Sequence, residues 1–190
     1  HLIYLLKNNH LGYHYPIIKG KEINRIWELR KAGLGLLSNI TSDERSVTVI
    51  EDTAVDIRDL PEYTKELIER MKQMGIRIIT YAHAGSGELH FHPILNLKTP
   101  RGVELYREVL VETAKIVKKY RGSLSGEHGD GRLRGELIPF MYGKEIYNLF
   151  KQIKAIFDPK GILNPGKIIG APPMNSFLRI DYRTKLPKIQ

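Results

Sequence analysis

Two histidines, His83 and His90, stand on either side of a short glycine-rich stretch and carry the clearest chemistry in the sequence. The residues around both have a strand-like pattern, and a two-residue loop at Ser86-Gly87 would join them as a β-hairpin. In that register the two histidines are directly opposed, with Cβ atoms about 5 Å apart on one face. His92, two residues beyond His90, falls on the same face. Two imidazoles placed in this way are able to share one metal ion.

A carboxylate and a further imidazole follow in the segment Gly126-Glu127-His128-Gly129. This segment comes after a short predicted strand whose end falls on the same sheet edge as the hairpin, about 10 Å from the His90 strand. Two histidines and one carboxylate are a common ligand set for a divalent metal and leave positions open for a substrate. His128 is a natural general base, because an imidazole gains and loses protons near neutral pH. The competing interpretation, ordinary hairpin histidines without a ligand, loses weight once Glu127 joins the pair.

The elements that must position these residues run β-α-β-β-α-β. The sequence predicts strands at 47–55, 77–83, 88–95 and 122–125, and helices at 61–75 and 102–120. Pro61 begins the first helix and Gly75 ends it, each at the position that the residue favours. This order predicts a ferredoxin-like unit, an α+β fold with an antiparallel sheet of strand order 4-1-3-2.

Additional helices flank the predicted ferredoxin-like unit. An apolar stripe predicts a helix from about residue 22, which Gly33 and Gly35 weaken or end, and a further helix is predicted at 144–157. The chain opens on an apolar, strand-like run. We divide it into residues 1–20, a partial lead-in from a preceding part of the protein, residues 21–171, one domain, and residues 172–190, a polar linker tail.

The composition is that of a soluble protein without cysteine. The chain has 190 residues, of which 42% are hydrophobic and 27% charged, and this suits one domain or slightly more. No apolar run approaches the roughly 18 residues that would cross a membrane. No signal peptide is evident, so we expect a cytoplasmic location, with peripheral membrane contact left open for a full-length protein. The lack of cysteine excludes disulfides, iron–sulfur ligation and a thiol nucleophile within this chain. Because the first residue is not Met, we expect a fragment that is inactive alone.

The basic charge raises an alternative function, a ferredoxin-like module that binds nucleic acid through its surface. The net charge is +9 and the pI is about 9.6. However, Lys and Arg are dispersed, with short clusters only at 118–121 and 132–134, and a nucleic-acid binder normally gathers them on one face. Such a module also needs stacking aromatics, and the central strands offer only Tyr81 and Phe91. We therefore expect no nucleic acid among the partners.

Three motifs, in this order, resemble the C-terminal domain of FAD-linked oxidases. They are His83-Ala-Gly-Ser-Gly-Glu-Leu-His90, Ser125-Gly-Glu-His-Gly-Asp-Gly131 and Phe157-Asp-Pro-Lys-Gly-Ile-Leu-Asn-Pro-Gly-Lys167. The family includes the D-lactate, glycolate and D-2-hydroxyglutarate dehydrogenases of the vanillyl-alcohol-oxidase superfamily. Residues 27–37 and 49–55 resemble the branch in which an iron–sulfur domain follows on the same chain. The resemblance extends over about residues 20–178.

The resemblance implies a flavoprotein oxidoreductase that oxidises a D-2-hydroxy acid, of the D-lactate or D-2-hydroxyglutarate type, to the 2-oxo acid. A separate N-terminal domain of the same protein would bind most of the FAD. The present chain would cover the flavin and hold the hydroxy acid. An iron–sulfur cluster would lie elsewhere in the full-length protein, and no transmembrane segment is expected here.

The resemblance also implies roles for particular residues. His83, His90 and Glu127 would bind a divalent metal of the zinc, manganese or iron type, and His128 would be the base.

Three further residues receive roles in substrate or flavin binding by the same resemblance. Arg30 would bind the substrate carboxylate. Asn164, in the turn Leu-Asn-Pro-Gly-Lys, would touch the flavin. His92 stands where the family often has Asn, and it would line the substrate site or act as a third imidazole ligand.

Overall fold

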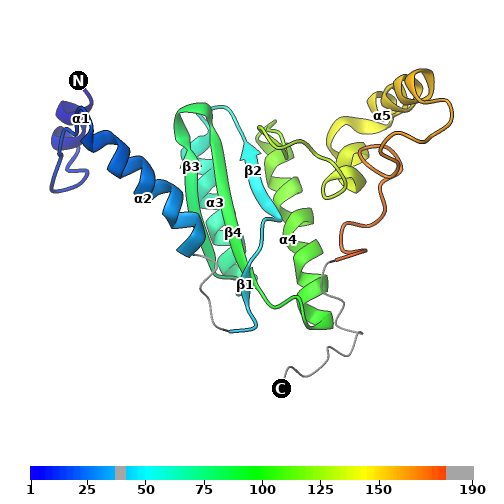
Figure 1. Cartoon of the computed structure of the whole chain (residues 1–190), viewed down its shortest axis with the longest axis horizontal. Helices are drawn as coiled ribbons and strands as arrows, with labels where there is room; N and C mark the ends of the chain where they lie inside the picture. Colours follow the sequence, from blue (N-terminus) through cyan, green and yellow to red (C-terminus); the bar gives the residue numbers. More distant parts are fainter. Residues whose placement is uncertain (37–41, 179–190) are drawn as a thin grey trace. The chain divides into compact units, whose positions relative to one another are not determined.

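The computed structural model describes residues 1–36 and 42–178 (Figure 1). The chain divides into two compact units, His1–Asn39 and Ile40–Gln190. The described part of the first unit contains two helices, α1 (Leu2–Asn8) and α2 (Glu22–Leu36). The second unit contains the sheet, the helices that pack on it and the candidate site.

The first unit corrects one prediction and extends another. The apolar opening run is helical, not strand-like, and Leu5 N donates to His1 O at 3.1 Å. A short apolar run is compatible with either structure, and here local i to i−4 hydrogen bonds form instead of a strand pairing. Helix α2 continues through Gly33 and Gly35. Each glycine costs roughly 1 kcal/mol relative to alanine, and the good helix formers around them offset that cost.

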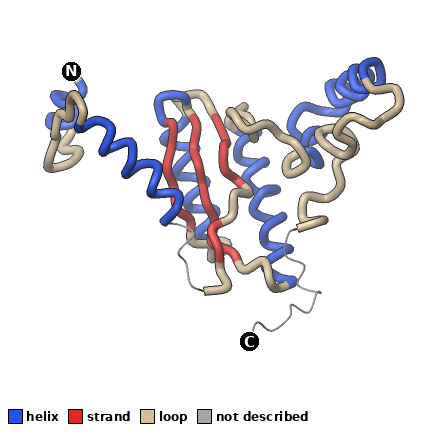
Figure 2. Tube along the Cα trace, in the orientation of Figure 1, coloured by secondary structure: helices blue, strands red, loops and turns tan. Residues whose placement is uncertain are grey.

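Strand β4 (Glu88–Leu95) is the centre of an antiparallel sheet (Figure 2). It pairs with β3 (Ile78–His83), with β2 (Ile50–Ala54) and, near its end, with the short β1 (Arg45–Ser46). The predicted last strand is reduced to an isolated bridge between Ser123 and Ala54. The order of neighbours is thus that of the predicted ferredoxin-like unit, and the α+β fold class is confirmed.

Helices α3 (Leu60–Gln73) and α4 (Pro100–Lys119) pack on the sheet through one apolar core. Both begin with proline in the first turn, and α3 is followed by Gly75 at φ +71°, the left-handed conformation that ends a helix. The core joins side chains of both helices to alternate residues of the strands; its fully buried members include Tyr63, Leu67, Met71, Val109, Leu110, Ile50 and Phe91. Burial of each such side chain contributes about 1.5–3 kcal/mol.

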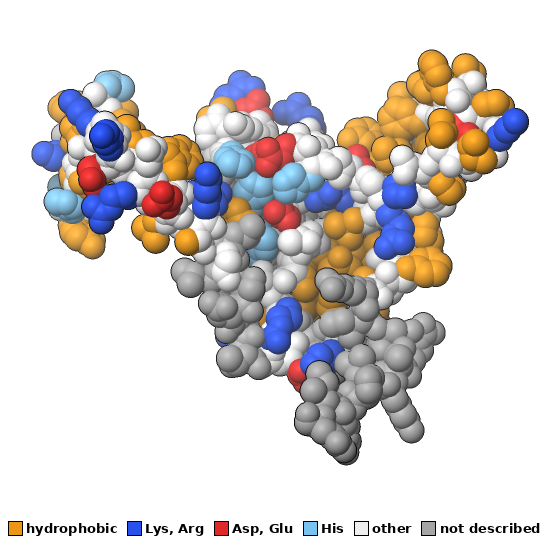
Figure 3. Space-filling view, viewed as in Figure 1, with side chains coloured by type: hydrophobic (Ala, Val, Ile, Leu, Met, Phe, Trp, Pro, Cys, Tyr) orange, Lys and Arg blue, Asp and Glu red, His pale blue; other side chains and the backbone are white. Residues whose placement is uncertain are grey.

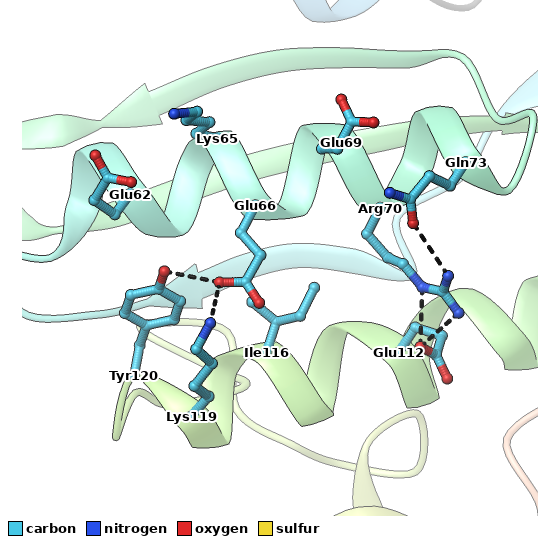
Figure 4. Close-up of a pocket in the computed structure, with 10 residues that line it drawn as sticks. All are labelled: Glu62, Lys65, Glu66, Glu69, Arg70, Gln73, Glu112, Ile116, Lys119 and Tyr120. Atoms are coloured by element: carbon cyan, nitrogen blue, oxygen red, sulfur yellow. Dashed lines mark hydrogen bonds and ion pairs between the residues drawn. The ribbon is translucent and has the colours of Figure 1, made fainter.

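The outer seam between α3 and α4 is a charged hollow (Figure 4). Arg70 pairs with Glu112 at 2.8 Å, and Glu66 accepts hydrogen bonds from Lys119 Nζ and Tyr120 Oη at 2.6 and 2.8 Å. These groups already pair with one another across the two helices. Exposed pairs of this kind contribute about 0–1 kcal/mol each, so the hollow is a helix–helix seam with little stabilising effect.

The β3–β4 hairpin has a longer turn than predicted. Residues Ala84–Ser86 form a short 3₁₀ turn, and Gly87 closes it at φ +72° with its N–H donating to Ala84 O at 3.1 Å. His83 therefore pairs with Glu88, and Tyr81, not His83, pairs with His90. The predicted register was wrong by two residues, because the two-residue loop left Ala84 and Gly85 in the ladder. A shift of two residues leaves every side chain on its predicted face.

We expect Gly87→Ala to lower the free energy of unfolding by more than about 2 kcal/mol. A Cβ at Gly87 would lie 2.1 Å from the carbonyl oxygen of Val55, and alanine would also have to adopt a left-handed φ. Gly85→Ala is the matched control in the same turn, since no atom lies within 4 Å of a Cβ there. Urea denaturation measures both variants, and equal losses of stability would contradict this reading of the turn.

The last described elements follow α4. A 3₁₀ turn (η3, Gly135–Leu137) leads into α5 (Ile138–Phe157), which has a kink at Gly143. The helix predicted from residue 144 is the part after this kink. In the predicted linker, Met174 is buried in the core, and its N–H donates to Glu136 at 2.9 Å; residues 179–190 lie outside the described residues. Among the described helices, none combines the length and apolar composition that crossing a bilayer requires.

Candidate metal centre

The alternation of side chains along β4 separates the core from the candidate site. Leu89 and Phe91 belong to the core packed against α3 and α4. Because successive side chains of a strand point to opposite faces, Glu88, His90 and His92 lie on the other face. Figure 3 shows histidine side chains grouped over the sheet, with acidic side chains among them.

His83, His90 and Glu127 come together as a three-residue cluster. One ligand atom from each lies within 4.8 Å of the other two. Glu127 Oε1 is 3.8 Å from His83 Nε2 and 4.0 Å from His90 Nε2. The side chains of His83 and Glu127 are half exposed, whereas His90 is almost fully buried. The cluster is therefore buried at His90, on the central strand, and open to solvent at His83 and Glu127.

The donor set of this cluster fits a divalent metal ion. Nitrogen and oxygen ligands bind zinc at about 2.0–2.2 Å, so they lie roughly 3–3.5 Å apart around the ion. The two separations at Glu127 exceed this by about an ångström or less, and all three ligand atoms lie within 4.8 Å of one another, so the side chains would have to close in to bind an ion. Burial lowers the pKa of His90, so its imidazole is neutral near pH 7 and its lone pair is available to a metal.

The other ring nitrogen of His90 provides a second sign of a metal site. His90 Nδ1 is buried without a hydrogen-bond partner, and Glu51 Oε1 lies 4.0 Å from it. Histidines that bind a metal through one nitrogen commonly donate the other N–H to a carboxylate. Glu51, whose side chain is 16% exposed, would accept this hydrogen bond if its carboxylate moved about 1 Å toward His90. Sequence reasoning missed Glu51.

A further carboxylate that sequence reasoning missed, Glu88, also borders His90. Glu88 Oε1 lies 3.8 Å from His90 Nε2 and is buried without a hydrogen-bond partner. Burial, and then the neighbouring Asp52 carboxylate, raise the pKa of Glu88. The signal in the sequence was its position, since Glu88, His90 and His92 alternate along one strand.

His128 lies beside the cluster on its open side. His128 Nε2 is 3.4 Å from Glu127 Oε1, and its ring stacks against that of His90 with centroids 5.9 Å apart. Its side chain is 45% exposed. The imidazole therefore adjoins the candidate ligands and is about half exposed to solvent.

The loop that carries Glu127 and His128 is anchored by Asp52, a residue that sequence reasoning missed. The fully buried Asp52 carboxylate accepts hydrogen bonds from the N–H groups of Gly126, Glu127 and His128 at 2.6–3.0 Å and from the Ser125 hydroxyl. Burial alone would raise the pKa of Asp52, but these hydrogen bonds outweigh it and lower the pKa to about 2. The available signal was an acidic residue inside a β-branched strand.

Of the other predicted site residues in the second unit, His92 and Asn164 lie outside this cluster. His92 is buried, with Nδ1 3.1 Å from Ser46 Oγ and Nε2 2.8 Å from Tyr81 Oη. Asn164, at φ +46°, lines a largely apolar hollow beside α5 whose lining includes none of the clustered histidines. Arg30 lies on α2, in the first unit. Their roles in substrate and flavin binding stay predictions.

The family follows from a comparison with known proteins. A family model described as the C-terminal domain of FAD linked oxidases matches residues 16–168. The chain belongs to this family. The match spans both units and contains the candidate metal centre and the Asp52 anchor, so these belong to the oxidase C-terminal domain.

Three relatives of this oxidase domain illustrate its similarities. D-2-hydroxyglutarate dehydrogenase of Pseudomonas putida is 35% identical over 155 residues, which are 81% of this chain and 15% of the relative. D-lactate dehydrogenase of Archaeoglobus fulgidus is 34% identical over 125 residues, 66% of this chain and 27% of the relative. Glycolate oxidase subunit GlcD of Bacillus subtilis is 28% identical over 148 residues, 78% of this chain and 31% of the relative. The chain spans less than a third of each.

Proposed function

We propose that this chain is the substrate- and metal-binding domain of a flavin-dependent dehydrogenase that oxidises a D-2-hydroxy acid to the 2-oxo acid. The observation that supports this most is the cluster of His83, His90 and Glu127, with ligand atoms within 4.8 Å of one another and His128 beside it. The names of the relatives add D-lactate and D-2-hydroxyglutarate as candidate substrates.

The residues of the cluster divide the chemistry between them. His83, His90 and Glu127 hold a divalent ion of the zinc, manganese or iron type, which when bound neutralises the substrate carboxylate and favours loss of the hydroxyl proton. His128 accepts that proton, since its imidazole lies beside the ligands on the open side. Arg30 binds the substrate carboxylate as a bidentate guanidinium, and His92 lines the substrate site. FAD supplies hydride acceptance, which is chemistry of the cofactor.

The remaining partners lie outside this chain in the proposal. An N-terminal domain of the same protein binds most of the FAD, and Asn164 of this chain touches the flavin. An iron–sulfur cluster, if the protein has one, is held elsewhere, because this chain contains no cysteine.

The alternative function, binding of nucleic acid, has less support from the sheet. Phe91 is fully buried in the core, and Tyr81 packs against His90 and His92 with ring centroids 4.9 and 5.1 Å apart. The two aromatics that would stack on bases are thus engaged within the protein, whereas base-stacking platforms need an accessible ring face.

We expect D-lactate or D-2-hydroxyglutarate to bleach the flavin absorbance of the complete FAD-loaded polypeptide under anaerobic conditions. Chelation should abolish the bleaching, and added Zn²⁺ or Mn²⁺ should restore it, because the His–His–Glu cluster has to be filled to bind the hydroxy acid. The L-enantiomers serve as controls. If neither D-acid nor glycolate reduces the flavin in metal-loaded protein, the proposed function is wrong.

A further inference from the structure

The loop between Ser125 and Arg134 carries the proposed base and one proposed ligand, but it has little structure of its own. No helix or strand is assigned from 125 to 134, and Gly129 and Gly131 adopt left-handed φ values of +83° and +51°. Glycine residues widen the range of conformations that a backbone can adopt and do not fix its path. Glu127 and His128 therefore need an anchor from elsewhere in the fold.

Asp52 provides that anchor from β2. Three successive backbone N–H groups, of Gly126, Glu127 and His128, converge on its two carboxylate oxygens at 2.9, 2.6 and 3.0 Å. The backbone carbonyl of Asp52 also accepts a hydrogen bond from Gly126 N at 2.7 Å. Hydrogen bonds to an ionised acceptor are shorter and stronger than neutral ones. The carboxylate therefore sets the path of the backbone at the two residues that carry the chemistry.

The backbone of Asp52 has an unfavourable conformation that the surrounding structure has to stabilise. Asp52 is fully buried and has φ +79°, a conformation that residues other than glycine rarely adopt. Such a conformation persists only where the neighbouring structure compensates for it, and it is concentrated at functional sites. The convergent donors of the loop are the compensation here.

Arg134 secures the other end of the same loop. It is 4% exposed, donates to Gly129 O at 2.9 Å and to the carbonyl of Glu51, and lies 3.8 Å from Asp52 Oδ2. One buried pair thus ties β2 to the loop on both sides of His128. The buried guanidinium also balances the charge of the buried carboxylate. Without a partner, a charge buried at that place would be strongly destabilising.

We propose that Asp52, balanced by Arg134, is the positioning residue that sets the geometry of Glu127 and His128 for metal binding and proton transfer. It acts through the backbone of the loop and does not touch the substrate. A displacement of about 1 Å in a catalytic group costs on the order of 10²-fold in rate. This inference rests on the proposed function for Glu127 and His128.

The test compares Asp52→Asn with Thr53→Val in the complete FAD-loaded polypeptide. Asparagine keeps the volume but turns an N–H₂ group toward backbone donors. Thr53 is the adjacent fully buried residue, and its hydroxyl accepts a hydrogen bond from Tyr63 at 2.7 Å on the core side, away from the loop. Both variants lose stability, but only Asp52→Asn disturbs the loop.

We expect Asp52→Asn to weaken Zn²⁺ or Mn²⁺ binding about 10–100-fold, as loss of an outer-shell partner does. At saturating metal, kcat should fall on the order of 10²-fold, with KM for the hydroxy acid changed less than kcat. Thr53→Val should leave metal affinity and kcat unchanged. Equal effects of the two substitutions, or wild-type metal affinity and kcat in folded Asp52→Asn, would overturn the proposal.

Hydrogen–deuterium exchange separates failure of this inference from failure of the proposed function. The peptide that contains residues 125–134 should exchange faster in Asp52→Asn than in wild type or Thr53→Val, whether or not hydroxy acids are oxidised. Unchanged exchange in that peptide would refute the anchor itself. If Asp52→Asn does not fold, Ser125→Ala replaces it, because this substitution removes one hydrogen-bond donor and keeps the carboxylate. Ser125→Ala should speed exchange of the same peptide and lower kcat, with a loss of kcat about a tenth of that expected for Asp52→Asn. Wild-type exchange and kcat in Ser125→Ala would count against the proposal.

Discussion

Replacing Glu127 by glutamine, or His90 by alanine, is expected to weaken divalent-metal binding by more than about 100-fold, because loss of an outer-shell partner alone costs 10–100-fold. Among the described residues the cluster offers three ligand atoms: His90→Ala removes one of them, and Glu127→Gln replaces an anionic carboxylate by a neutral amide, which is a weaker ligand. Glu127→Gln is the sharper variant, since that side chain is 51% exposed and the change is isosteric. Metal content after dialysis, together with competition titration against a chelator, measures the effect.

The controls for metal binding separate ligand loss from unfolding. His14→Ala removes an exposed histidine of the first unit and should leave metal affinity unchanged. His90 is buried on the central strand, so His90→Ala is accompanied by thermal denaturation to establish that the variant is folded. One equivalent of metal retained at wild-type affinity in folded His90→Ala and in Glu127→Gln would remove the cluster as the metal site.

Replacing His128 by alanine is expected to lower kcat for flavin reduction by roughly 10² to 10⁴ while the metal remains bound. His128 adjoins Glu127 at 3.4 Å but is not one of the three clustered ligands. Proton transfer from the substrate hydroxyl would lose its acceptor, whereas the ligand set stays intact. The rate of the reductive half-reaction with D-lactate and D-2-hydroxyglutarate, measured beside metal content, checks both parts of this expectation.

Comparison of neighbouring residues makes the His128 experiment decisive. Glu127→Gln should lose metal and rate together, whereas His128→Ala should lose rate alone. If folded His128→Ala reduces the flavin as fast as wild type, His128 is not the base. His92 is then a poor alternative candidate for the base, because both of its ring nitrogens already have hydrogen-bond partners, in Ser46 and Tyr81.

Local patterns in the sequence were sufficient for most elements of the second unit and for the side chains that share a face. They were wrong for the opening run, which is helical, and for the last predicted strand, which is reduced to a bridge. The predicted bounds of β4 are those that occur, and the predicted order of the ferredoxin-like unit is the order of the sheet. The hairpin register was wrong by two residues, yet His83, His90 and His92 still share a face. The reason is the two-residue period of a strand, which makes the face insensitive to an even shift.

Contacts between distant segments could not be predicted in the same way. Asp52 stands inside a β-branched stretch that indicates a strand but not its partner, and nothing within a few residues of Arg134 indicates burial or a partner. Asp52 binds the loop 73 to 76 residues later in the chain. The roles of Arg30 and Asn164 came from motifs alone, and Asn164 lines a hollow whose lining contains none of the clustered histidines.

By itself, the sequence indicated the family, the fold class and the candidate metal ligands, because motif, periodicity and side-chain chemistry are local properties. Tertiary structure alone decided that ligand atoms of His83, His90 and Glu127 lie within 4.8 Å of one another, and that a buried carboxylate from β2 holds the loop that completes the set. Those features depend on how a turn closes and which backbone donors converge on Asp52. Both are settled only when segments far apart in the chain pack together.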